Sequence, residues 1–396
     1  MARILLVNKF YYPRGGDCTA VLTTERLLKA KGHAVAVFSM QHPDNIASPY
    51  DAYFPEEISF SARGLYQKMK AAVRIFRSSG VVAKFNQILN DFKPDVVHLH
   101  NIHSYLSPVI AQVAHTRGIR VVWTLHDYKL ICPAYNCLRA GKPCELCYTD
   151  KLNVLTHRCM KNSRVASLLA WMEAVYWNRK KLERITDRFI SPSFFLKEKM
   201  VSAGFRSEQI DVLHNFMHKE NPSVVAKEDY YCYVGRLSEE KGVETLLEAA
   251  QHVPFPLKII GGGPLLDRYK TQYPQANIEF SGQLPFEQLL PIVQRARFLV
   301  LPSIWYENNP YSVIEALCMG TPVLGAKIGG IPELIEEGIN GLSFESGNPD
   351  DLRNNIRKMY EIAFDYHEIA QKAQNSFLAD TYYNRLLEIY NNKYIS

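Results

Sequence analysis

Two glutamates, Glu307 and Glu315, stand eight positions apart within residues 301–326. The first follows an apolar, strand-like run, and the second lies in a helical pattern that starts at Pro310 and stops at Gly320. A helix N-terminus presents unpaired backbone N–H groups, which favour an anion such as phosphate. A carboxylate repels phosphate and accepts hydrogen bonds from hydroxyls instead. The stretch predicts a ligand with phosphate between two hydroxyl-bearing ends, as in a nucleotide sugar; a plain βαβ turn with surface glutamates is the alternative.

Two cations on a second loop extend this chemistry. Gly235 and Arg236 follow the strand-like run YYCYV, and Lys241 stands five residues after Arg236, just before a helical run. Paired cations bind a diphosphate and stabilise the negative charge that develops on it as it leaves. The alternative is a surface loop in which Glu239 and Glu240 pair with these two bases.

Both loops resemble those of retaining glycosyltransferases of family four, which have the GT-B fold and an E-x7-E motif. The resemblance rests on GRLSEEKG, GGGP, YENNPYSVIEA and GGIPELI, which occur in that order. It implies transfer of a sugar from a nucleoside diphosphate donor, UDP- or GDP-linked, with retention of anomeric configuration and without a metal ion or other catalytic cofactor. The base, the sugar, the acceptor and the linkage stay open.

The resemblance also implies roles for individual residues. Glu307 orients the donor sugar, Glu315 binds the ribose hydroxyls, and Arg236 with Lys241 stabilises the leaving diphosphate. His126, in the run His-Asp-Tyr, helps to hold the donor sugar, whereas His100 and His103 are weaker candidates. Other donor-binding positions are Gly15, Gly16, Gly235, Gly282, Leu284, Asn309, Pro310, Tyr311, Ser312 and Val313. No nucleophile pair is visible, which favours front-face attack with the leaving phosphate accepting the acceptor's proton.

Strand and helix patterns alternate along the whole chain. The opening run ARILLV, a loop with Gly15 and Gly16, a helix over residues 19–31 and the strand AVAVFSM form a Rossmann-like start. The same order returns after a polar linker at residues 217–229. We therefore predict an α/β protein of the GT-B class, with two Rossmann-like domains facing a central cleft. Residues 1–216 form the acceptor side and 217–380 bind the donor, while a helix over 381–396 is expected to cross back to the first domain.

Charge is divided unevenly between the two halves. The chain of 396 residues has a net charge of +6, yet residues 1–215 carry 30 Lys and Arg against 17 Asp and Glu. Bases alternate with apolar residues through 61–92, which predicts peripheral contact with an anionic membrane; a solvated face of an ordinary core helix is the alternative. The acceptor is expected to be a glycan or a lipid-linked molecule, and the enzyme is expected to act in cell-surface polysaccharide synthesis. No signal peptide or spanning segment is visible, so we expect a cytoplasmic enzyme at the inner face of the membrane.

Five of the eight cysteines fall within residues 132–159. Cys144 and Cys147 form a C-x2-C pair, and Cys132 with Cys159 would complete four ligands of a structural zinc ion. Free buried thiols or catalytic redox chemistry are alternatives for these five cysteines, which include Cys137, and disulfides are not expected in the cytosol. After this segment, residues 163–184 form one long predicted helix, with aromatic and basic residues that suit an interface, an acceptor groove or ordinary packing.

Three other functions agree less well with the sequence. A dinucleotide oxidoreductase fits poorly, because no G-x-G-x-x-G follows the first strand and no acid ends the second. A nucleotide-sugar epimerase of the GT-B fold agrees less well with the basic first half. A zinc-stabilised nucleic-acid-binding module is disfavoured because the cysteines lie inside an α/β domain and the bases show no repeat, so no nucleic-acid partner is expected.

Overall fold

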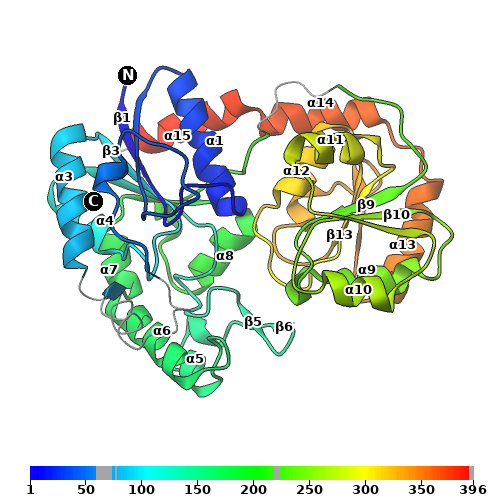
Figure 1. The fold of residues 1–396 in the computed structure, drawn as a ribbon, viewed down its shortest axis with the longest axis horizontal. Helices are drawn as coiled ribbons and strands as arrows, with labels where there is room; N and C mark the ends of the chain where they lie inside the picture. Colours follow the sequence, from blue (N-terminus) through cyan, green and yellow to red (C-terminus); the bar gives the residue numbers. More distant parts are fainter. Residues whose placement is uncertain (59–73, 76–77, 218–222, 392–396) are drawn as a thin grey trace. The chain divides into compact units, whose positions relative to one another are not determined.

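The computed structural model describes residues 1–58, 74–75, 78–217 and 223–391 (Figure 1). The chain divides into two compact units, and each is treated by itself. The first unit comprises Met1–Cys137, Glu145–Leu213 and Tyr383–Ser396, and the second comprises Leu138–Cys144 and His214–Tyr382. Of the described helices, none is both long and apolar enough to cross a bilayer.

A six-stranded parallel sheet forms the centre of the first unit, in the order β2-β1-β3-β4-β7-β8. Its strands are β1 (Arg3–Val7), β2 (Ala34–Phe38), β3 (Val96–Leu99), β4 (Arg120–Thr124), β7 (Arg188–Ser191) and β8 (Ile210–Val212). They are short and apolar because helices cover both faces of such a sheet. The order reverses between β1 and β3, so the loops that follow these two strands meet at one edge.

Helices and short turns connect the strands of the first unit. They are α1 (Gly16–Ala30), η1 (Asp51–Tyr53), α3 (Ser79–Phe92), α4 (Val109–Thr116), η2 (Leu146–Tyr148), α5 (Asn153–Thr156), α6 (Arg164–Tyr176), α7 (Arg179–Arg184), α8 (Phe194–Ser202) and η3 (Ser207–Gln209). The last helix, α15 (Ala379–Asn391), adds its residues from Tyr383 onward to this unit, where the Tyr390 hydroxyl lies 2.7 Å from Nδ1 of His98 on β3.

The second unit has the Rossmann strand order around its own parallel sheet, β11-β10-β9-β12-β13-β14. The strands are β9 (Tyr231–Val234), β10 (Leu257–Ile260), β11 (Ile278–Gly282), β12 (Leu299–Leu301), β13 (Val323–Ala326) and β14 (Gly341–Phe344). The order reverses between β9 and β12. In such sheets, ligands bind beyond the carboxyl ends of the strands at this reversal.

Helices lie on both faces of the second sheet. Figure 1 shows α11 (Phe286–Arg295), α12 (Tyr311–Cys318) and α14 (Tyr366–Phe377) on one side. On the other side are α9 (Val243–Ala250), α10 (Leu266–Gln272) and α13 (Pro349–Glu361). Single turns stand at η4 (Glu239–Lys241) and η5 (Pro332–Leu334), and the short hairpin β5–β6 (Leu138–Arg139, Lys142–Pro143) is antiparallel.

One helix prediction changes in the structure, and another lies largely outside the described residues. The predicted helix over residues 163–184 is two helices, α6 and α7, because the Asn178 side chain accepts a hydrogen bond from Lys181 N and starts a new helix. Much of the predicted basic region, residues 59–73 and 76–77, lies outside the described residues. Its described end, α3, buries Val81, Phe85, Ile88, Leu89 and Phe92, as a core helix does.

Candidate functional site

The loops after β9 and β12 bring a buried ion pair to the reversal point of the second sheet. Oε1 of Glu307 lies 2.7 Å from Lys241 Nζ and accepts hydrogen bonds from Ser303 Oγ at 2.7 Å and Trp305 Nε1 at 2.8 Å. The Lys241 ammonium also stands 5.0 Å from the ring centroid of Trp305. Lys241 is therefore paired with the distant Glu307, not with neighbouring Glu239 or Glu240.

The electrostatics of this pair keep Glu307 ionised. Burial alone would raise the pKa of its carboxyl, but Lys241 and the hydrogen bonds from Ser303 and Trp305 outweigh burial and lower it. Among the described residues, the donors to this carboxylate all reach Oε1. The second oxygen, Oε2, has no donor described and can accept a hydrogen bond from a ligand hydroxyl.

Two glycines allow the loops to approach so closely. Gly242 has φ +64°, and a Cβ there would stand 2.0 Å from the carbonyl oxygen of Pro302. Gly329 has φ +62°, and its Cβ would meet the carbonyl oxygen of Glu307 at 2.4 Å. The Glu307 carbonyl also accepts a hydrogen bond from Gly330 N at 2.7 Å. The loop that carries Glu307 is therefore packed against the backbone at Gly242 on one side and at Gly329 and Gly330 on the other.

Glu315 and the start of α12 lie directly after this loop. Pro310 is the N-cap residue, and Tyr311 and Ser312 form the first turn, whereas Val313 N already donates to the Pro310 carbonyl at 3.2 Å. Glu315 is buried one turn further on, and burial raises the pKa of its carboxyl to about 8. The two glutamates thus differ, since Glu307 is ionised at neutral pH and Glu315 is mostly protonated in the ligand-free protein.

The other predicted donor-side residues have diverse surroundings. Asn309 holds the segment after β8, because its Oδ1 and carbonyl oxygen accept hydrogen bonds from the backbone and side chain of Asn215, each at 2.7 Å. Arg236 is exposed beside Gly235 at the end of β9. Gly282 ends β11 with φ +71°, and Leu284 packs against the core of the second unit.

A second cluster of polar side chains lies at the carboxyl edge of the first sheet. His126, after β4, has its Nε2 2.9 Å from Nδ1 of His100, and burial lowers the pKa of His126 to about 4. His103 is buried and stacks on Trp123, with ring centroids 5.2 Å apart. His98 is hydrogen-bonded through both ring nitrogens, to the Tyr390 and Thr124 hydroxyls. A carboxylate that is not among the predicted site residues also acts on His126, where its negative charge opposes the effect of burial on the pKa.

That group is Asp17, which directly follows Gly15 and Gly16 at the start of α1. Its carboxylate stands 3.9 Å from Lys9 Nζ and accepts a hydrogen bond from Asn101 Nδ2 at 2.9 Å. Burial would raise the pKa of Asp17, but Lys9, His126 and Asn101 lower it, so the group is ionised. The position of Asp17 directly after the glycine loop could have marked it as a site residue in the sequence. Its contacts with Lys9 and Asn101, however, depend on the order of strands β1, β3 and β4 in the sheet.

The cysteines are arranged differently from the prediction. Cys132 contacts the thiols of Cys137 and Cys147, which lowers the pKa of Cys132 and raises the pKa of the other two. No described group of three or more His, Cys, Asp or Glu side chains is arranged to hold a metal ion. The zinc site predicted on Cys132, Cys144, Cys147 and Cys159 is therefore not supported, and the contact of Cys132 with Cys137 involves a cysteine outside that set. None of the eight cysteines, all of which lie among the described residues, forms a disulfide bond.

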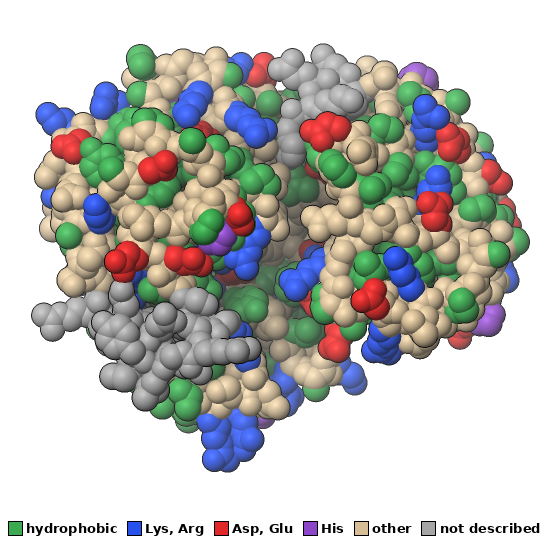
Figure 2. Space-filling view, viewed as in Figure 1, with side chains coloured by type: hydrophobic (Ala, Val, Ile, Leu, Met, Phe, Trp, Pro, Cys, Tyr) green, Lys and Arg blue, Asp and Glu red, His purple; other side chains and the backbone are tan. Residues whose placement is uncertain are grey.

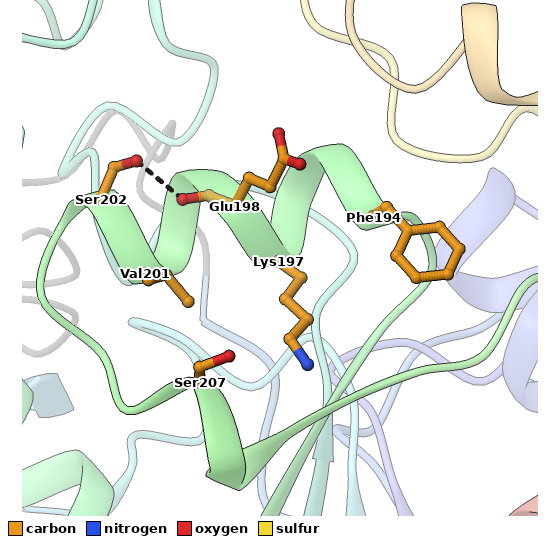
Figure 3. A pocket seen from close by; sticks show the side chains of 6 residues that line it. All are labelled: Phe194, Lys197, Glu198, Val201, Ser202 and Ser207. Atoms are coloured by element: carbon orange, nitrogen blue, oxygen red, sulfur yellow. Dashed lines mark hydrogen bonds between the residues drawn. The ribbon is translucent and has the colours of Figure 1, made fainter.

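Two cavities of the first unit lie away from these residues. One of about 490 Å³ lies along α8 of the first unit and is lined by Phe194, Lys197, Glu198, Val201, Ser202 and Ser207 (Figure 3). The Ser202 hydroxyl donates to the Glu198 carbonyl within the same helix, so it is already satisfied. None of the predicted site residues lines this cavity.

Two protein-family models together match almost the entire chain. The one described as Glycosyltransferase Family 4 matches residues 15–220, and the one described as Glycosyl transferases group 1 matches residues 217–376. The chain belongs to Glycosyltransferase Family 4. A Klebsiella pneumoniae relative, described as an uncharacterized 42.6 kDa protein in the cps region, is 28% identical over 84% of this chain and 87% of its own.

One further match covers a short part of the chain, and another is a solved structure with a similar fold. The putative colanic acid biosynthesis glycosyltransferase WcaL of Salmonella typhimurium is 35% identical, over 27% of this chain and 30% of its own length. The crystal structure of Anabaena Alr3699/HepE in complex with UDP and glucose is 18% identical with a TM-score of 0.67, over 98% of this chain and 99% of that one. The predicted GT-B fold of this glycosyltransferase, with two parallel six-stranded sheets, is thereby confirmed.

Proposed function

We propose that this glycosyltransferase moves a sugar from a nucleoside diphosphate sugar to a glycan or lipid-linked acceptor, with retention of configuration and without a metal ion. The observation that carries the proposal is the buried Lys241–Glu307 pair at the N-terminal end of α12, with Glu315 behind it. The site thus offers a cation and N–H groups for a diphosphate between two carboxylates for hydroxyls. These carboxylates match the E-x7-E spacing.

In this mechanism the bond between the anomeric carbon and the β-phosphate oxygen breaks, and the acceptor oxygen bonds to the same face of the sugar. The acceptor's proton passes to the leaving phosphate oxygen. Arg236 and Lys241 stabilise the charge on that phosphate. Oε2 of Glu307 binds a sugar hydroxyl, Glu315 binds the ribose, and neutral His126 hydrogen-bonds a sugar hydroxyl.

The setting of the reaction is proposed from relatives. WcaL is described as acting in colanic acid biosynthesis, and the Klebsiella relative comes from a cps region. Together with the basic first half, they support a role in cell-surface polysaccharide synthesis at the cytoplasmic face of an anionic membrane. The donor nucleoside is proposed to be uridine or guanosine, with uridine favoured by the UDP complex of Alr3699/HepE.

The test uses the purified chain with UDP-, GDP- and ADP-sugars, monitored by proton NMR. We expect release of one nucleoside diphosphate in the presence of EDTA, and a product whose newly formed linkage keeps the donor's anomeric configuration. An inverted first product would overturn the mechanism. A free sugar epimerised at the carbon next to the anomeric centre would instead assign the epimerase activity.

Asp17 gives a further prediction on the acceptor side. We propose that its ionised carboxylate binds a hydroxyl of the acceptor, so the variant Asp17→Asn should raise the acceptor KM. The loss of a hydrogen bond to a charged group corresponds to roughly a tenfold to hundredfold change. Steady-state kinetics at saturating donor measure it.

The donor-side readout separates this role from a structural one. Donor hydrolysis without acceptor should proceed at the wild-type rate in Asp17→Asn. If donor KM and hydrolysis fall together with acceptor binding, Asp17 supports the fold of the loop and does not contact the acceptor.

A further inference from the structure

Helix α6 of the first unit buries polar residues and exposes apolar ones, the reverse of an ordinary surface helix. Its buried residues are Ser167, Ala170 and Glu173, two of which are polar. The large apolar residues lie outside, with Val165 70%, Leu168 39%, Val175 48% and Tyr176 45% exposed. Their spacing of three, ten and eleven positions from Val165 places them on one face of the helix.

The polar residues on the buried face of α6 form an ion pair and hydrogen bonds, and these contacts keep the apolar face turned outward. Glu173 lies 3.0 Å from Lys129 Nζ and accepts a hydrogen bond from Ser104 Oγ at 2.7 Å. Ser167 Oγ accepts one from Met160 N at 3.1 Å. Turning the apolar face inward would leave the Glu173 carboxylate and Lys129 without each other, which is costly for buried charges. The exposed apolar face is thus a stable feature of the molecule.

Positive charge surrounds this face. Residues 151–184 contain eight Lys and Arg but only two acids. Both acids are buried and engaged, Glu173 with Lys129 and Glu183 with Arg179. In Figure 2, Lys and Arg side chains lie at the lowest edge of the first unit, where Figure 1 places α5. The exposed bases stand at both ends of the helix: Arg158, Lys161 and Arg164 before or at its start, Lys180 and Arg184 after its end.

We propose that this α6 surface, formed by Val165, Leu168, Val175, Tyr176 and the five exposed bases, docks onto a bilayer that contains anionic lipids. An apolar stripe bordered by Lys and Arg has the composition of helices that lie in a membrane interface. Lys181, whose ammonium stands 3.8 Å from the ring centroid of Tyr176, adds a cation beside an interfacial aromatic. A second copy of the chain is a poor occupant, because two positively charged faces repel.

The surface deepens the proposed function, since a lipid-linked acceptor lies in the same membrane. It also relocates the membrane contact that the sequence predicted within residues 61–92. Docking through α6 does not depend on donor binding, so the two proposals can fail separately.

The experiment is cosedimentation of the full chain with vesicles of phosphatidylcholine, with and without phosphatidylglycerol. The wild type should bind only the phosphatidylglycerol vesicles, and less at high salt. Each Lys or Arg near an anionic surface contributes about fivefold to binding, so Lys161→Gln with Lys180→Gln should weaken it about 25-fold. Val165→Ser with Leu168→Ser should weaken it at least about tenfold, because the apolar anchors are lost.

Matched controls are Ile339→Ser and Lys270→Gln, an exposed apolar residue and an exposed base of the second unit. These should bind vesicles like the wild type. The proposal is overturned if the wild type ignores phosphatidylglycerol or if the α6 variants bind as well as the controls. It is also overturned if the wild type is a dimer that Val165→Ser with Leu168→Ser separates, since the face then belongs to a second copy.

Each variant is also tested for stabilisation by nucleoside diphosphates. Vesicle binding by the wild type that is lost in the α6 variants, with nucleotide stabilisation unchanged, supports the membrane surface. Absence of nucleotide stabilisation in every form would count against the proposed function alone.

Discussion

Replacing Lys241 by alanine is expected to abolish sugar transfer and to destabilise the fold at the same time. Glu307 is 7% exposed, and the only cation described against it is Lys241, at 2.7 Å. Removing one partner of a buried pair costs about 3 to 5 kcal/mol, because an uncompensated charge remains. At a catalytic site the lost cation also costs roughly a hundredfold to a thousandfold in kcat. Thermal unfolding and initial rates measure the two effects on one sample.

A second variant separates charge burial from catalysis. Lys241→Ala combined with Glu307→Gln should recover much of the stability, because an amide needs no counter-ion and can still accept from Ser303 and Trp305. It should remain inactive. If Lys241→Ala is as stable as the wild type, or retains near-normal turnover, the pair does not have the role proposed here.

The pair also predicts how stability changes in acid. The pKa of Glu307 is lowered in the folded protein, so its ionisation stabilises the fold above its ordinary pKa. That contribution is lost as the pH falls from this ordinary value through the lowered one. The variant Lys241→Ala with Glu307→Gln should lack this part of the acid dependence.

Replacing Glu315 by glutamine should have the opposite effect on stability while it weakens donor binding. Burial raises the pKa of Glu315 to about 8, against an ordinary value of 4.5. The folded state therefore binds a proton that the unfolded state releases, and stability falls as the pH rises from 4.5 to 8. The variant avoids this loss, which is about 1.4 kcal/mol for each pH unit of the window. Thermal unfolding at pH 5 and pH 8 should show a gain for the variant at pH 8 only.

The same substitution, Glu315→Gln, is also expected to change how donor affinity depends on pH. Ribose hydroxyls donate to an ionised carboxylate, so wild-type affinity should rise with pH up to about 8, the pKa of Glu315, and then level off. In Glu315→Gln the affinity should be roughly tenfold to hundredfold lower and without this pH dependence. An unchanged affinity with the same pH profile as the wild type would remove Glu315 from the ribose site.

The local elements of the candidate donor site could be predicted from the sequence because they are encoded in short stretches. The helix start at Pro310, the glutamate spacing and the Arg236–Lys241 loop are local patterns. No short stretch of sequence, however, specifies that these elements meet in space. Lys241 reaches Glu307 because β9 and β12 are neighbours at a reversal of strand order, which no single stretch specifies.

Other features could not be predicted because tertiary contacts decide them. The hydrogen bonds between Asn309 and Asn215 join residues 94 positions apart, so no short stretch of sequence specifies them. Cys132 has Cys137 as a neighbour because the chain turns sharply between them, at Tyr135 with φ +63°. Helix α6 turns its apolar face outward because Glu173 forms a buried ion pair with Lys129, 44 positions earlier in the chain. The free energy of keeping this pair together exceeds the gain from burying the apolar face.

The most direct test of the account is titration calorimetry of the purified chain with UDP, GDP, ADP, their sugars and NAD. The account predicts saturable binding of one nucleoside diphosphate and its sugar, with affinity strongly reduced in Glu315→Gln. If no nucleoside diphosphate binds, or if NAD alone binds, the chain does not use the site at α12 for a nucleotide sugar, and the proposed reaction is wrong.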